Sequence, residues 1–175
     1  QYRTAWKPGG RVLIIGGPNA PSDITLGTPY DPAGPPESVH TLRLPERFQS
    51  HLEREGAQRG YKVVPLVSWE SLAHQTFDDI VLLGADRTLY EAIEPLAANG
   101  ALINLVGTSG LSETQVDVGR LHYDHIGIVG TVTPIIAAGY APIRSEFKPR
   151  GRMLLLGAAG PMGQMHFQRA LQDPA

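Results

Sequence analysis

Six short apolar runs, separated by glycines, prolines and helical patterns, constrain the fold of this chain most. Each run has four to six residues, mainly Val, Ile, Leu, Met and Ala, with at most one polar interruption. Such runs are typical of strands buried on both faces of a parallel sheet. They cover residues 12–15, 63–67, 80–83, 101–106, 126–129 and 153–156.

Helical patterns lie between these runs, at residues 45–59, 89–99 and 163–171. Pro45 suits a first helical turn, and Gly60 and Gly100 follow the last turns. Strands that alternate with helices predict an α/β fold, a doubly wound and mainly parallel sheet with helices on both faces. Residues 18–37 contain six prolines and predict a long loop where a crossover helix is normally found.

Composition excludes several classes of protein. The 175 residues are 42% hydrophobic and 18% charged, which favours one folded domain, or one domain plus a fragment of another, over disorder. The net charge of -2 makes nucleic acid an unexpected partner, and no apolar stretch reaches the about 20 residues that cross a membrane. Because there is no cysteine, we expect no disulfide and a reducing, cytoplasmic location.

An internal repeat relates the two ends of the chain. Residues 3–16 align with residues 144–157, and seven of the fourteen positions are identical. We interpret this as a tandem duplication, with chance similarity between two turns as the alternative. Residues 1–140 then form one Rossmann-like unit with a degenerate glycine loop. Residues 141–175 form the opening strand, glycine loop and helix of a second, truncated unit, so the chain is expected to be a fragment of a longer protein.

The glycine loop of the second unit predicts a phosphate site. Gly157, Gly160 and Gly163 lie between an apolar run and a helix, with Pro161 and Met162 inside the turn. Such a turn brings backbone N–H groups at a helix N-terminus close to a pyrophosphate. The alternative is a glycine-rich corner that binds nothing. The acidic residue that would bind a ribose is expected roughly 20 residues further on, past Ala175, so NAD and NADP are not distinguished.

The equivalent loop of the first unit differs. Pro18 and Pro21 have no backbone N–H, and Asp23 would repel a phosphate. We therefore predict that residues 16–23 are a structural or recognition loop without pyrophosphate binding. The chain alone should bind a dinucleotide weakly or not at all. We also expect one face of the first sheet to lack a helix, and the second unit to pack there beside Gly84 and Gly107.

Several segments together resemble the cofactor-binding domain of the medium-chain dehydrogenase/reductase superfamily, which includes zinc-type alcohol dehydrogenases and quinone reductase-like enzymes. They are residues 77–84, 89–99, 100–107, 125–131 and the Lys-Pro-Arg-Gly-Arg-Met-Leu-Leu-Leu-Gly-Ala-Ala-Gly-Pro-Met-Gly segment, 148–163. The resemblance implies a Rossmann fold, NAD or NADP as cofactor, and a cofactor cleft lined by Gly84, Gly107 and Gly130. Thr108 follows a strand end, where it is a candidate polar contact for the cofactor. The loop at 18–37 and the missing barrel-like domain with its zinc ligands depart from the family.

The leading hypothesis is the nucleotide-binding region of an NAD(P)-dependent oxidoreductase, not catalytic alone, whose substrate groups come from other domains of a longer chain. Two alternatives stay open: a non-catalytic interaction or dimerisation module, which includes a homodimer, and an S-adenosylmethionine-dependent methyltransferase. No catalytic residue is assigned. No metal site is predicted, because His122, Asp124 and His125 are typical of a solvated turn and His166 of an exposed helical position. Asp86 is predicted to cap a helix, and Arg3 and Lys7 to lie on the surface.

Overall fold

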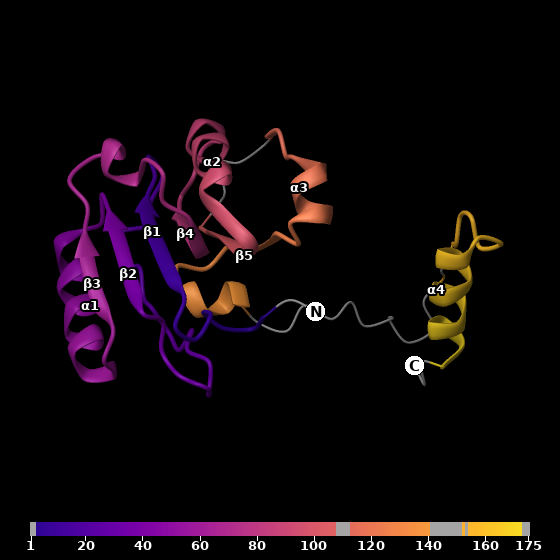
Figure 1. The fold of residues 1–175 in the computed structure, drawn as a ribbon, viewed down its shortest axis with the longest axis horizontal. Helices are drawn as coiled ribbons and strands as arrows, with labels where there is room; N and C mark the ends of the chain where they lie inside the picture. Colours follow the sequence, from indigo (N-terminus) through magenta and orange to yellow (C-terminus); the bar gives the residue numbers. More distant parts are fainter. Residues whose placement is uncertain (1–2, 108–112, 141–151, 153, 173–175) are drawn as a thin grey trace. The chain divides into compact units, whose positions relative to one another are not determined.

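The structure of the chain, a computed structural model, describes residues 3–107, 113–140, 152 and 154–172. The chain divides into two compact units, unit 1 (Gln1–Pro142) and unit 2 (Ile143–Ala175). Unit 1 contains a six-stranded parallel sheet with the strand order β3-β2-β1-β4-β5-β6 (Figure 1). The strands are β1 (Arg11–Gly16), β2 (Ser38–Leu42), β3 (Lys62–Pro65), β4 (Phe77–Leu83), β5 (Ala97–Val106) and β6 (Gly127–Thr131).

Helical segments connect most of these strands. The α-helices are α1 (Glu46–Arg59), α2 (Arg87–Ile93), α3 (Val118–Tyr123) and, in unit 2, α4 (Pro161–Gln172). Three short 3-10 helices are η1 (Trp69–Leu72), η2 (Glu94–Leu96) and η3 (Ile136–Tyr140). The strand order, with its reversal between β1 and β4, is that of a Rossmann-like doubly wound sheet, so the predicted fold class is confirmed. No helix among the described residues has both the length and the apolarity that a membrane span requires.

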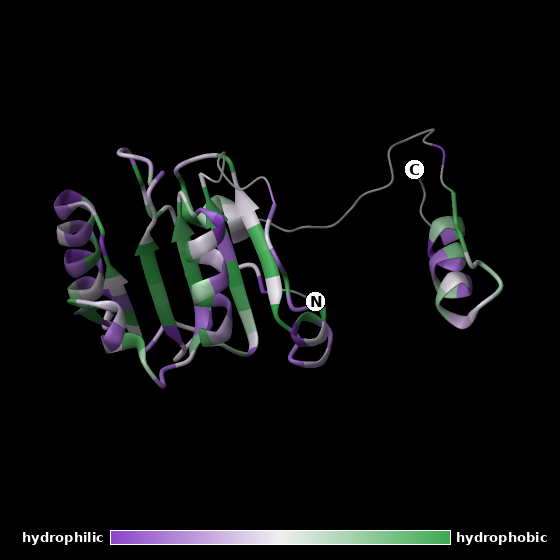
Figure 2. Ribbon diagram, turned by 90° about the horizontal axis from the view of Figure 1, so that it is seen from above, coloured by the Kyte–Doolittle hydropathy of each residue, from purple (hydrophilic) through white to green (hydrophobic). Residues whose placement is uncertain are grey.

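Two apolar clusters, one on each face of the sheet, form the core of unit 1. One contains Phe48 and Leu52 of α1 together with Ile136 and Tyr140 of η3. The other contains Leu89, Tyr90 and Ile93 of α2, with Leu121 of α3 packed against it. The strands themselves are the most hydrophobic part of the ribbon (Figure 2). Helical segments therefore cover both faces, as predicted.

The proline-rich loop between β1 and β2 takes the place of a crossover helix. Its residues Ile24 and Leu26 are buried in the same cluster as α1 and η3, together with Trp6. Tyr30 packs edge-on against Trp6, with 5.5 Å between the ring centroids. The expectation that this face lacks cover is therefore wrong, because the loop, Trp6 and η3 bury it.

Five of the six predicted strands form, at 12–15, 63–67, 80–83, 101–106 and 126–129, with small shifts in their ends. β3 ends at Pro65, and Val67 is 95% exposed. The sixth strand of the sheet is β2, which the sequence analysis missed, while the predicted strand at 153–156 is wrong over its described residues, 154–156. In unit 2 these residues have no second described strand with which to exchange hydrogen bonds.

The predicted helix at 45–59 is confirmed as α1, which ends at Gly60 with a φ of +85°. Asp86 caps α2 as predicted, because its Oδ1 accepts a hydrogen bond from the Leu89 amide at 2.8 Å. The prediction of a helix to residue 99 is wrong. Pro95 has no amide to continue the helical ladder, so α2 ends at Ile93, η2 follows and β5 begins at Ala97.

Candidate functional site

The carboxyl ends of β1 and β4 mark the point where the strand order reverses, and open α/β sheets bind ligands there. In unit 1 the loop after β1 lies across these ends. The amide of Gly17 donates to the Leu83 carbonyl at 2.8 Å, and the amide of Asn19 donates to the Gly84 carbonyl at 3.1 Å. Two amides of the degenerate loop thus have acceptors within the chain and are not directed at a phosphate.

Gly84 and Gly107, predicted to line a cofactor cleft, are in close contact with this loop. Gly84 has a φ of +59°, and a Cβ on it would lie 2.0 Å from the backbone of Asn19. A Cβ on Gly107 would lie 2.7 Å from Cγ of Pro21. Both glycines are explained by the close approach of the chain's own residues 19–21.

Gly130 and Thr108 complete the predicted cleft. Gly130 lies in β6 opposite Leu105 of β5, and a Cβ on it would lie 2.8 Å from the Leu105 carbonyl oxygen. Close packing of the two strands therefore accounts for this glycine. Thr108 and the neighbouring Ser109 lie outside the described residues.

The glycine turn of unit 2 is a compact turn that leads directly into helix α4. Gly157 has a φ of +77°, and its carbonyl accepts a hydrogen bond from the Gly160 amide at 3.1 Å. A Cβ on Gly163 would lie 2.1 Å from the Gly157 carbonyl oxygen, so the turn requires glycine at position 163. At Gly160 a Cβ would make only an ordinary contact, 3.6 Å from the same oxygen.

Helix α4 begins directly in this turn. Pro161 is its first residue, where a missing N–H costs nothing because the first amides have no partner within a helix. The Gln164 amide donates to the Gly160 carbonyl at 2.9 Å, and those of Met162 and Gly163 make no backbone hydrogen bond among the described residues. Unit 2 thus presents free amides at the positive end of a 12-residue helix.

His166 lies exposed on α4, as the sequence predicts. His122 is in α3, and His125 precedes β6 with a φ of +55°. Asp124 is the C-cap of α3 and pairs with Arg120 at 2.9 Å. Across the described ranges, no three His, Asp or Glu side chains form a group that could hold a metal ion.

A buried carboxylate, Asp79, is a feature that the sequence analysis missed. It lies in β4 with no exposed surface, 3.1 Å from a guanidinium nitrogen of Arg3, and it accepts a hydrogen bond from the Lys7 amide at 2.9 Å. Burial raises the pKa of the Asp79 carboxyl to about 7, although the Arg3 charge favours the ionised form. The prediction that Arg3 is a simple surface residue is therefore wrong. The available signal was an acidic residue inside an apolar strand.

Comparison with known proteins gives structural likeness only. No protein-family model matches the chain, and no curated protein matches its sequence. Solved structures with a similar arrangement include a cobalt- and zinc-bound thermostable alcohol dehydrogenase from Pyrobaculum aerophilum (TM-score 0.45, 15% identity, 78% of this chain and 39% of that one). An acetophenone reductase from Geotrichum candidum in complex with NAD has a TM-score of 0.45 and 16% identity over 71% of this chain and 34% of that one. The chain thus spans less than two fifths of the length of either enzyme.

Proposed function

We propose that this chain is the nucleotide-binding region of an NAD(P)-dependent oxidoreductase related to the medium-chain dehydrogenases. In this proposal the turn from Gly157 to Gly163 and the first turn of α4 bind the pyrophosphate of the dinucleotide. The observation that carries it is the glycine turn that opens directly into a helix with free N-terminal amides.

The residues of unit 2 fit this role. Gly157 and Gly163 are required by the turn itself, whereas Gly160 is not, since a methyl group there meets only an ordinary contact. In a dinucleotide-binding turn, the middle glycine lets the backbone approach the pyrophosphate. Gly160 is thus the position where a side chain would interfere with the ligand and not with the fold.

The cofactor would supply hydride transfer when bound, and the turn would fix the position of its phosphates. Met162 and Gly163 would donate their amides to phosphate oxygens, and Pro161 would set the direction of the first turn. Groups that act on the substrate would come from other parts of a longer protein. The positive end of α4 favours either NAD or NADP.

A second function is favoured for unit 1, because its loop crosses the strand ends where a dinucleotide would bind. The amides of Gly17 and Asn19 are already used, and Pro18 and Pro21 offer none. We propose that unit 1 is a Rossmann-like module that no longer binds a dinucleotide and acts as a structural or interaction domain.

A titration of the chain with NADH and NADPH tests the proposal. We expect weak binding, in the millimolar range, because the turn supplies only the pyrophosphate contacts. Gly160→Ala should weaken it about tenfold or more, since the added methyl group displaces the phosphates. Gln168→Ala, at an exposed position further along the same helix and outside the turn, is the control and should bind like the wild type. Equal affinity of all three chains, or no binding by any of them, would reject the assignment.

A further inference from the structure

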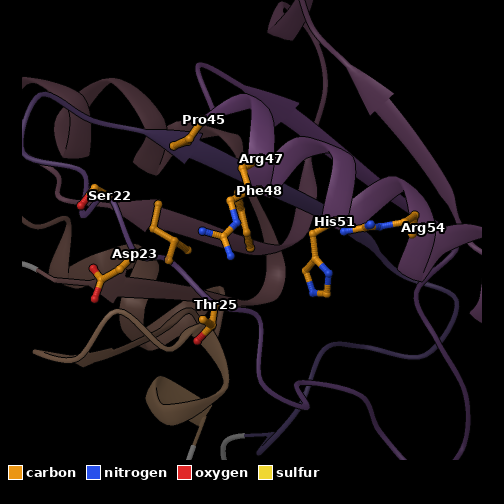
Figure 3. Close-up of a pocket in the computed structure, with 9 residues that line it drawn as sticks. Ser22, Asp23, Thr25, Pro45, Arg47, Phe48, His51 and Arg54 are labelled. Carbon is orange, nitrogen blue, oxygen red and sulfur yellow. The ribbon is translucent and has the colours of Figure 1, made fainter.

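A cavity of about 390 Å³ lies between α1 and the proline-rich loop of unit 1 (Figure 3). Its walls include residues 22–25 of the loop, Pro45, and one side of α1 from Arg47 to Arg54. Ile24 on the loop wall and Phe48 on the α1 wall are both buried in the same apolar cluster. The cavity is therefore on the sheet face where the crossover helix is replaced by a loop, and that replacement accounts for the space beside α1.

The α1 wall of this cavity is positively charged. Arg47, His51 and Arg54 recur every three or four residues, which places them on one face of the helix. Figure 3 shows Arg47 and His51 extending from α1, with Ser22, Asp23 and Thr25 on the facing loop. Cationic side chains gathered along a cavity wall create a favourable potential for an anion.

The two arginines have no ion-pair partner among the described residues. This distinguishes them from Arg59 at the end of the same helix, which pairs with Glu55 at 2.8 Å. Both Arg47 and Arg54 are exposed, so neither guanidinium is needed to neutralise a buried carboxylate. Their forked donors are free to bind two oxygens of a phosphate or carboxylate group.

The loop wall offers different chemistry. Ser22 and Thr25 carry hydroxyl groups, and Asp23 carries a carboxylate that accepts hydrogen bonds. A ligand that placed its anionic group toward α1 would leave its other end near these groups, and hydroxyl hydrogens on that end could be donated to Asp23. The apolar surface of Ile24 and Phe48 lies between the two polar walls.

We infer that this cavity binds a small hydroxylated organic anion, with its phosphate or carboxylate on Arg47, His51 and Arg54 and its hydroxyl groups on the Asp23 loop. The site shares no residue with the proposed dinucleotide site. It belongs to unit 1, whereas the glycine turn that would bind the pyrophosphate belongs to unit 2.

The test is to titrate the whole chain separately with glycerol 3-phosphate, glycerate and glycerol. Calorimetry measures the binding, and amide NMR identifies the residues involved. We expect that at least one of the two anions binds, that neutral glycerol does not, and that the perturbed amides include those of residues 22–25 and 47–54. Arg47→Ala and Arg54→Ala should each lower the affinity for the anion about tenfold, since each substitution removes charge-assisted hydrogen bonds.

Lys62→Ala is the matched control. Lys62 is an exposed residue of β3 outside the cavity, and its loss changes the net charge by the same amount. Equal weakening by Lys62→Ala would show that general charge is responsible, and equal binding of glycerol would show that the anion is not recognised. Absence of binding, or perturbation of the same amides by NADPH with displacement of the anion, would also overturn the inference.

Discussion

Asp79 shows how one residue fixes the N-terminal segment to the sheet. Its carboxylate is fully buried in β4 and receives both the Arg3 guanidinium and the Lys7 amide. The neighbouring Asp78 pairs with the Lys7 ammonium at 2.6 Å. Two adjacent carboxylates therefore hold the segment that precedes β1, and Trp6 between these contacts is completely buried.

Titration of Asp79 should make stability depend on pH. Its pKa is raised from 3.8 to about 7, so between these values the folded chain keeps a proton that the unfolded chain has released. The contribution of Asp79 to the free energy of unfolding should therefore fall as the pH rises from the lower of these values to the higher, by up to about 4 kcal/mol. Urea unfolding of the wild type and Asp79→Asn at about pH 4 and about pH 8 measures this contribution. Identical pH dependence of the two chains would contradict the assignment.

At the scale of elements, apolar runs in the sequence predict five of the six strands. The strand β2 has no such run and is not predicted. β2 contains the buried polar residues Ser38, His40 and Thr41, so it has no apolar run. Conversely, the apolar run at 153–156 is not a strand over its described residues, because strand formation depends on a partner that sequence periodicity does not reveal. The glycine turn was predictable, since both its spacing and its following helix are local.

The close approach of residues 19–21 to the strand ends was not predictable from the local sequence pattern. Its contribution to stability can be measured by substitution of Gly84. Gly84→Ala should destabilise unit 1 by about 1–3 kcal/mol more than Gly9→Ala. Both glycines have a similar positive φ, +59° and +64°, but a Cβ on Gly84 meets Asn19 while one on Gly9 meets nothing within 4 Å. The left-handed conformation alone costs about 1–2 kcal/mol at each position. Equal losses in urea unfolding would mean that the loop is not held against Gly84.

At the scale of the whole molecule, two segments that are similar in sequence have different surroundings. The repeat aligns Gly16 with Gly157, yet the first segment leads into a loop whose amides bind the sheet, and the second leads into a helix with free amides. The prolines at 18 and 21 contribute to the first outcome, because they leave the first loop without two backbone amides, and Pro21 could not donate within a helix that began near Pro18. We therefore propose that a dinucleotide binds to the second turn and not to the first.

Amide NMR spectra of the isotope-labelled chain during titration with NADH test this claim most directly. We expect progressive shifts of the amides of Met162, Gly163 and their neighbours in the turn, with little change for Gly17, Asn19 and Gly84. Gly160→Ala should reduce the shifts in the turn. Shifts concentrated at Gly17, Asn19 and Gly84, with none in the turn, would show that the dinucleotide binds at the sheet of unit 1 and not at the glycine turn.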